Sequence, residues 1–170
     1  MSMLFGEKSK FALECELESP LDEFFNCKIC LWANGEQIGD YERGSSLRVS
    51  ASFFRDTLKF VSRLHDEALD GKSAETILKF IYEKLYEIPE EDVSVEELEN
   101  HWQRYGKFLI CPDGGPAFDG WLAALLVEMT GERFLWRYAL GAAHESSLPT
   151  GGYEATVSSF LVWADQIIRN

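Results

Sequence analysis

Acidic residues are the side chains with reactive groups that cluster most densely in this chain, and the cluster lies near its middle. Residues 83–99 hold eight acidic side chains and one lysine. A run of this kind is usually a solvated surface. The alternative is a docking surface for a basic protein, because complementary charges accelerate association. Two aromatic residues follow the run and suit either a binding anchor or core packing. The candidate binding residues are Glu90, Glu91, Asp92, Glu96, Glu97, Glu99, Trp102 and Tyr105.

A phosphate-binding loop is excluded by one residue. Gly71, Lys72 and Ser73 resemble the end of such a loop, but Asp66 stands where the loop needs its first glycine. A carboxylate at that position would repel a phosphate group. The triplet is therefore expected to form a turn followed by a helix cap.

The cysteines and histidines do not show the pattern of a metal site or of a catalytic nucleophile with its base. Cys27 and Cys30 have the spacing of zinc and redox sites, but they fall in a predicted strand, where residues three apart point to opposite faces. The three histidines, His65, His101 and His144, show no ligand spacing and no partner nucleophile. We expect no metal, no cofactor, and cysteines that are structural.

The overall charge predicts what kind of partner the chain would attract. Sixteen basic residues stand against 29 acidic ones, for a net charge of -13. This field repels nucleic acid and anionic lipid, so a cationic protein is the expected partner. The longest uninterrupted apolar run, residues 121–127, is far shorter than the ~20 residues of a membrane span. The first residues lack the pattern of a secretory signal, which favours reduced thiols and a cytoplasmic location.

Alternation of apolar and polar residues predicts two groups of strands. In residues 11–42, two runs and a returning strand flank the turn at Asn34-Gly35, as in a three-stranded antiparallel meander. Residues 121–129 and 134–140 flank Thr130-Gly131 and favour a hairpin, although a short buried helix also suits the first of them.

Helical spacing of apolar residues predicts three helices. They cover about residues 50–69, a second segment capped by Ser73 and ended by Pro89, and a last segment across residues 157–168. No repeat or linker divides the chain. We expect one α+β domain over residues 1–170, with the meander and the hairpin as two halves of one antiparallel sheet system covered by about three helices.

Several short motifs carry a resemblance to a known family. They are residues 10–14 (KFALE), 30–35 (CLWANG), 38–42 (IGDYE), 46–48 (SLR), 118–121 (FDGW), 134–137 (FLWR) and 148–151 (LPTG). In order and spacing the chain resembles the forty-second numbered class of immunity proteins from bacterial polymorphic toxin systems. The resemblance implies a cytosolic α+β protein that binds and neutralises a cognate toxin domain and is not an enzyme.

The same resemblance separates framework positions from the binding surface. Residues 49–106 match no motif and contain the acidic run, so by analogy the toxin would bind there. Core packing or turn geometry is the favoured role of the motif positions, with toxin contact as the alternative. These positions are Trp32, Gly39, Asp40, Tyr41, Asp119, Gly120, Trp121 and Trp136.

The charge independently favours an inhibitor of a basic protein. Many intracellular toxins are nucleases, which need a cationic groove that an anionic protein can occupy. An acidic adaptor or chaperone for another basic bacterial protein fits the composition equally well. A hydrolase is the least favoured alternative, with Asp40, Asp119 and His144 as its nominal catalytic residues. The sequence leaves the oligomeric state open.

Overall fold

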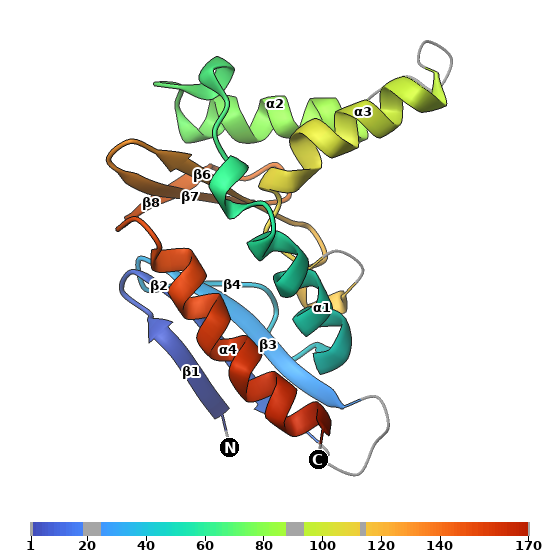
Figure 1. Ribbon diagram of the computed structural model, residues 1–170, viewed down its shortest axis with the longest axis vertical. Coiled ribbons are helices and arrows are strands. Elements are labelled where there is room, and N and C mark those ends of the chain that lie inside the picture. Colours follow the sequence, from blue (N-terminus) through green and yellow to red (C-terminus); the bar gives the residue numbers. More distant parts are fainter. Residues whose placement is uncertain (1, 19–24, 88–93, 113–114, 170) are drawn as a thin grey trace.

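The computed structural model describes residues 2–18, 25–87, 94–112 and 115–169. Its lower half in Figure 1 is a five-stranded antiparallel sheet with strand order β1-β2-β3-β4, in which β5 also pairs with β3. Its upper half contains a separate three-stranded antiparallel sheet, β6-β7-β8. The strands are β1 (Ser2–Glu7), β2 (Phe11–Leu17), β3 (Asn26–Ala33), β4 (Glu36–Ile38), β5 (Gly44–Ser46), β6 (Trp121–Glu128), β7 (Gly131–Tyr138) and β8 (His144–Leu148).

The described residues form four α-helices, three of which cover the sheets. α1 and α4 lie side by side on one face of the five-stranded sheet, and α2 lies on the three-stranded sheet. α3 packs on α2 at one end and projects from the body as an arm (Figure 1). None of these helices has the length and apolar character that a membrane span requires. Their bounds are α1 (Leu47–Leu58), α2 (Ala74–Tyr86), α3 (Val95–Tyr105) and α4 (Gly152–Arg169).

The strands confirm the α+β class and the meander, with corrections in detail. β2, β3 and β4 form the meander, but β4 ends at Ile38 and β1 and β5 extend the sheet. β6 and β7 form the favoured hairpin and not the alternative helix, and β8 adds a third strand. The meander and the hairpin belong to two sheets rather than to one, because no ladder joins them among the described residues.

The structure confirms the predicted helices after Ser73 and across residues 157–168, and it corrects the helix predicted over residues 50–69. Ser73 caps α2 through the N–H of Thr76, as the sequence indicates. The helix expected over residues 50–69 ends at Leu58 and continues as two short 3-10 turns. The apolar spacing runs past this end because Leu64 stays buried while its carbonyl accepts the N–H of Val127 on β6.

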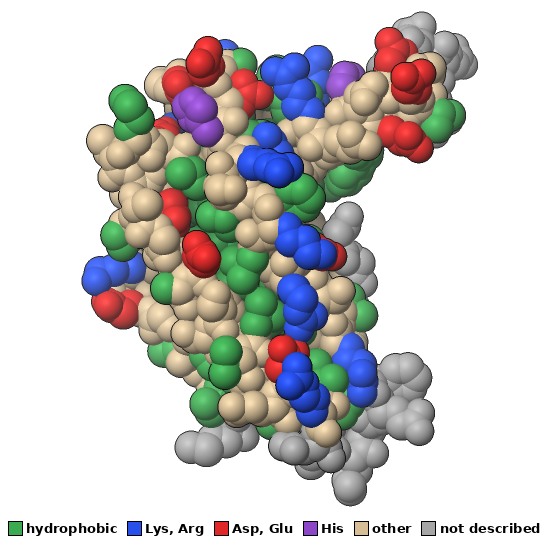
Figure 2. Space-filling model, in the orientation of Figure 1, with side chains coloured by type: hydrophobic (Ala, Val, Ile, Leu, Met, Phe, Trp, Pro, Cys, Tyr) green, Lys and Arg blue, Asp and Glu red, His purple; other side chains and the backbone are tan. Residues whose placement is uncertain are grey.

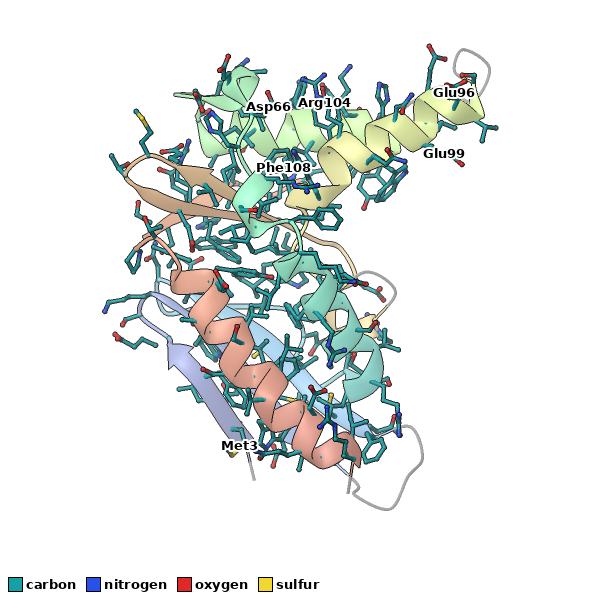
Figure 3. The ribbon with its side chains drawn as sticks, viewed as in Figure 1. Met3, Asp66, Glu96, Glu99, Arg104 and Phe108 are labelled. Carbon is teal, nitrogen blue, oxygen red and sulfur yellow. The ribbon has the colours of Figure 1, made fainter. Side chains whose placement is uncertain are left out.

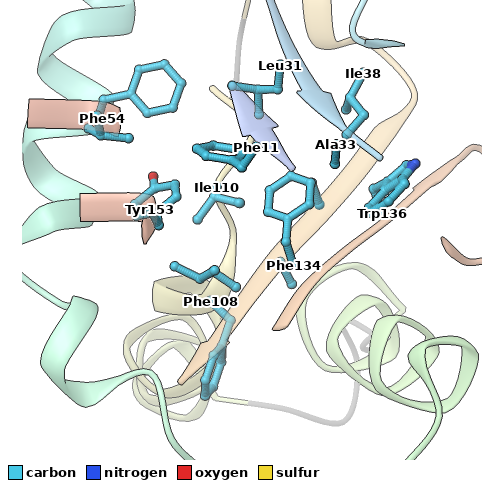
Figure 4. Packing of buried hydrophobic residues seen from close by; sticks show 14 of the residues in the cluster. Phe11, Leu31, Ala33, Ile38, Phe54, Phe108, Ile110, Phe134, Trp136 and Tyr153 are labelled. Carbon is cyan, nitrogen blue, oxygen red and sulfur yellow. The ribbon is translucent and has the colours of Figure 1, made fainter. Parts of the chain in front are cut away.

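The core joins the two sheets around one cluster of aromatic rings (Figure 4). The ring of Phe11 on β2 lies 5.0 Å from that of Phe134 on β7 and 5.4 Å from that of Tyr153 on α4. Thr57 on α1 shares a 2.7 Å hydrogen bond with the buried Tyr153 hydroxyl. Burial raises the pKa of Tyr153 well above its ordinary value. The phenol therefore stays neutral and fixes α4 against α1.

Gly39 holds the loop before β6 against the end of β4. Its φ is +101°, and a Cβ there would lie 2.9 Å from the ring of Phe118. The next residue, Asp40, donates its N–H to the carbonyl of Ala117 and accepts the N–H of Glu42. The motif at residues 38–42 thus fastens the motif at residues 118–121.

Gly39→Ala is expected to lower the free energy of unfolding by about 2 kcal/mol, because it combines an unfavourable backbone conformation with a steric clash. Gly35→Ala is the matched control. Gly35 also has a positive φ, of +80°, but an added Cβ would meet nothing within 4 Å. Urea unfolding of both variants checks the difference. Equal losses would show that Phe118 readily moves aside.

Candidate functional site

A pocket of about 550 Å³ lies beneath the projecting helix α3. Its walls come from the end of α2, from α3, from the loop before β6 and from the adjoining ends of β6 and β7. Figure 2 shows the molecule hollowed under the α3 arm, with hydrophobic side chains on the underside of that arm. We call this pocket the α3 groove. Its described aromatic and charged lining residues are Phe53, Tyr82, Tyr86, Glu87, Trp102, Phe118, Asp119, Trp121 and Arg137.

Several aromatic side chains line the groove, and two of them are accessible to a partner. Trp102 is 41% exposed and Tyr86 is 47% exposed, and their rings meet edge to face at 5.7 Å. Trp121, from the opposite wall, packs on Tyr138 with ring centroids 5.1 Å apart. Leu140 closes this side and is 86% exposed. Exposed rings that already contact one another lose little side-chain entropy on binding, which makes them effective anchors.

Trp102 is held in place by its own helix. A Cβ on Gly106 would lie 2.8 Å from Cε3 of Trp102, so the ring occupies space that only glycine leaves free. Tyr105 points the other way: it is buried and packs edge to face on Phe80 of α2 at 5.3 Å. Of the two aromatic candidates from the sequence, Trp102 therefore lies on the accessible surface and Tyr105 lies in the core.

The acidic candidates that the structure describes lie at the far end of α3 (Figure 3). Ser94 and Glu97 form a reciprocal capping box at the start of this helix. Hydrogen bonds from Ser94 lower the pKa of Glu97. Glu96 and Glu99 are exposed, and Glu96 lies beside Glu97 in the first turn of α3. The other acidic candidates, Glu90, Glu91 and Asp92, lie outside the described residues.

One cationic side chain reaches the groove from its floor. Arg137 on β7 has a side chain only 6% exposed. Its guanidinium lies 5.4 Å from the ring of Tyr82 and 3.9 Å from a carboxylate oxygen of Glu75. Its Nε has no hydrogen-bond partner in the described part of the chain. The groove therefore combines aromatic walls with an incompletely paired buried cation.

The motif positions at residues 38–42 and 118–121 meet beside the groove. Arg43 bridges them, with an ion pair of 3.0 Å to Asp119 and a longer one of 3.9 Å to Asp40. Asp119, Gly120 and Trp121 then continue into the groove lining. One motif thus positions part of the candidate binding surface.

The remaining motif positions form local networks elsewhere. Trp32 is half-buried and donates to Glu14, which also accepts from Lys8 and Ser2. Burial raises the pKa of Glu14, but these hydrogen bonds outweigh it and the net shift is downward. Tyr41 donates to Ser2. The indole N–H of the buried Trp136 donates to Glu36, which lies 3.3 Å from His144.

The nominal hydrolase residues do not form one constellation. Asp40 and Asp119 are exposed and share Arg43, whereas His144 pairs with Glu36 and stacks on Trp136. Within the described residues these contacts do not bring the three side chains together around a nucleophile. Asp40 and Asp119 are better explained as partners of Arg43 that hold two loops together, and His144 as a ring that stacks on Trp136.

Three of the four cysteines lie in the five-stranded sheet, on both of its faces, and Cys111 lies in the α3 groove lining. Cys27 faces the helices near Cys15, and Cys30 lies on the opposite face across from Glu14. A contact with Cys27, together with burial, raises the pKa of Cys15, and burial raises the pKa of Cys30 to about 12. The raised pKa values of Cys15 and Cys30 favour the protonated thiols, which bind metal poorly. No group of three ligating side chains occurs among the residues that the structure describes.

The sequence predictions missed the groove because they missed α3. The capping pattern of Ser94 and Glu97 was the available signal for this helix. Tyr86 and Arg137 gave no signal, since Tyr86 lies within a predicted helix and Arg137 alternates with apolar residues in a predicted strand. Arg137 is buried only because α2 packs over β7, and this packing places its side chain at the floor of the groove.

Comparisons with known proteins identify the family. In structure the chain is similar to CdiI from Burkholderia dolosa, with a TM-score of 0.77 and 15% identity over 95% of this chain and 99% of that chain. At this identity the likeness shows a shared fold. No curated protein matches the sequence significantly. The family model "Immunity protein 42" matches residues 3–163. The chain therefore belongs to the immunity protein 42 family of polymorphic toxin systems, and is an immunity protein rather than an enzyme.

Proposed function

We propose that this immunity protein neutralises its cognate toxin by forming a stoichiometric complex through the α3 groove. The single observation that carries this proposal is the accessible aromatic lining under α3, beside the exposed carboxylates at the end of the same helix. Binding hot spots typically combine aromatic side chains at the centre of an interface with polar or charged residues at its rim. The complex would form in the cytoplasm. A toxin that is made in the cell or enters it would be bound there before it acts.

The proposed toxin surface is cationic. The chain carries a net charge of -13, and Glu96 and Glu99 extend that charge to the tip of the arm. A basic nuclease is the toxin class that such a surface fits best, because its phosphate-binding groove attracts carboxylates. An anionic protein in that groove blocks the substrate both sterically and electrostatically.

Co-expression with the cognate toxin tests the function. We expect the chain to restore growth and to purify with the toxin domain in a 1:1 complex that lacks toxin activity. An adaptor or chaperone would bind a basic partner without suppressing toxicity. Binding without growth rescue would therefore overturn the immunity role proposed here and favour that alternative.

The exposed acids of α3 are expected to steer the toxin. The double variant Glu96→Lys/Glu99→Lys should slow association by about tenfold at low ionic strength, with a smaller effect at high salt. Stopped-flow measurements at several salt concentrations check this result. The same expectation extends to reversal of Glu90, Glu91 and Asp92.

The matched control reverses two distant acids by the same total charge. Glu18 follows β2 and Glu154 lies in the first turn of α4, both far from the arm. Glu18→Lys/Glu154→Lys should slow association much less. Equal effects from the two double variants would assign the steering to net charge and remove the α3 tip from the proposed surface.

A further inference from the structure

The arginine in the floor of the α3 groove is paired far less well than its neighbour on the same strand. Arg133 makes hydrogen bonds to the Lys72 carbonyl, to Glu128 and to Glu145, the closest at 2.6 Å. Arg137, four residues later, has its 3.9 Å approach to Glu75 and an Nε without a partner. Its side chain is nevertheless 6% exposed against 17% for Arg133.

A buried cation without close acceptors is unfavourable unless something completes its pairing. Removing a guanidinium from water has a large desolvation cost, which close hydrogen bonds to a carboxylate normally offset. The ring of Tyr82 offsets part of it by cation–π attraction at 5.4 Å. The remaining donors of Arg137 suit a planar acceptor with two oxygens, because guanidinium and carboxylate match as a two-bond pair.

The groove also restricts how that acceptor can arrive. Its walls near Arg137 are Tyr82, Leu122 and Ala123, and its rim carries the acidic residues Glu87 and Asp119. A free anion that lacks an apolar group to pack on these walls is disfavoured by this rim and by the net charge of -13. A carboxylate carried on a predominantly cationic protein surface is attracted as part of that surface instead.

We infer that the α3 groove accepts an acidic side chain of the toxin, flanked by an apolar or aromatic residue, whose carboxylate pairs with Arg137. This inference rests on the proposed function, since it assumes that the toxin occupies the groove. It adds that an otherwise cationic toxin surface presents one carboxylate at its centre. The pairing would supply specificity, whereas the acids of α3 supply the rate of association.

Small indole compounds test the chemistry of the groove without the toxin. Indole-3-acetate, indole-3-acetamide and tryptamine share one ring and carry a negative, a neutral and a positive side chain. Chemical shifts of the Arg137 Nε–H and of the tryptophan indole N–H groups, followed during titration, report binding. We expect the acetate to bind about tenfold more tightly than the acetamide. Equal binding of the two, or preference for tryptamine, would overturn the inference.

Variants of the two arginines locate the effect. Arg137→Gln should remove the preference for the acetate, and Arg133→Gln should leave it intact. Arg137→Lys keeps the charge without the planar two-bond geometry and should keep only part of the preference. Circular dichroism and thermal unfolding show that each variant is folded. Because the lysine variant preserves the buried cation, it tests the inference even where the glutamine variant unfolds.

The toxin complex then identifies the source of the carboxylate. Arg137→Gln should weaken toxin binding about tenfold, mainly through faster dissociation, and bound toxin should displace indole-3-acetate. Unchanged toxin affinity would overturn this inference even where the indole compound binds. The proposed function would still stand in that case, provided that reversal of Glu96 and Glu99 slows association and the chain rescues growth.

Discussion

Trp102→Ala is expected to weaken toxin binding about thirtyfold, which corresponds to about 2 kcal/mol. Trp102 has the largest aromatic surface on the accessible side of α3, and its ring is placed by contacts with Tyr86 and Gly106 before any partner arrives. A positioned aromatic ring gains contact area on binding without much loss of rotamer freedom. Isothermal titration calorimetry with an inactivated toxin domain measures the change in dissociation constant.

Phe60→Ala is the matched control for this prediction. Phe60 is 39% exposed, nearly the same as Trp102, and does not line the α3 groove. Its removal should change toxin affinity by less than about twofold. Urea unfolding of both variants separates loss of binding from loss of stability. Wild-type affinity in Trp102→Ala would place the toxin on another surface.

A second variant displaces the same ring without deleting it. Gly106→Ala adds a Cβ 2.8 Å from Cε3 of Trp102 in the present arrangement, so the ring must move. We expect an affinity loss in the same direction as that of Trp102→Ala but smaller, because the aromatic surface is retained. An increase in affinity would show that the observed ring position is not the one that binds.

The sequence predicted the strands and helices correctly where the local pattern of apolar residues agrees with their packing in the fold. The alternation in β2 and β3 and the turn at Asn34-Gly35 specify the meander, because a shift of one residue would expose the buried face. The stripe in α4 likewise matches its buried side. In these elements the apolar residues of the pattern are the ones that the fold buries.

The sequence failed where tertiary contacts override local pattern. Val61 and Leu64 continue the apolar spacing of α1, but they are buried by short turns that bind β6 rather than by a longer helix. α3 shows the opposite case: Val95, Leu98, Trp102 and Tyr105 repeat at helical spacing, but only Tyr105 of this helix is buried. Its capping box and its packing on α2 stabilise it. The α3 groove depends on this packing of α3 on α2, which the local sequence pattern does not specify.

Glu132 illustrates a structural role with no local signal, and its removal is expected to have the largest effect on stability. The side chain lies on β7 and is 2% exposed. Its two oxygens accept the N–H groups of Gly151 at 2.7 Å and of Tyr153 at 2.9 Å, at the start of α4. The partners are about twenty residues away in sequence, so only the folded chain brings a carboxylate to this helix end.

Glu132→Ala is expected to lower the free energy of unfolding by about 3 kcal/mol, because it leaves two backbone donors without their acceptors, one of them at a fully buried residue. It also removes an anion from the N-terminal end of α4, where the helix dipole favours one. Urea unfolding should show a lower midpoint at an unchanged slope. Hydrogen exchange should accelerate most in the first turn of α4, since this turn loses its cap.

Glu154→Ala provides the comparison on the same helix end. Glu154 lies in the first turn of α4 but is exposed, so it interacts with the helix dipole through solvent. Its removal should change the free energy of unfolding by about 0.5 kcal/mol or less. If both variants unfold at the same urea concentration, the buried carboxylate is replaceable by water and the link from β7 to α4 does not stabilise the fold. A large loss confined to Glu132→Ala would show that this link holds α4, and with it Tyr153, against the rest of the core.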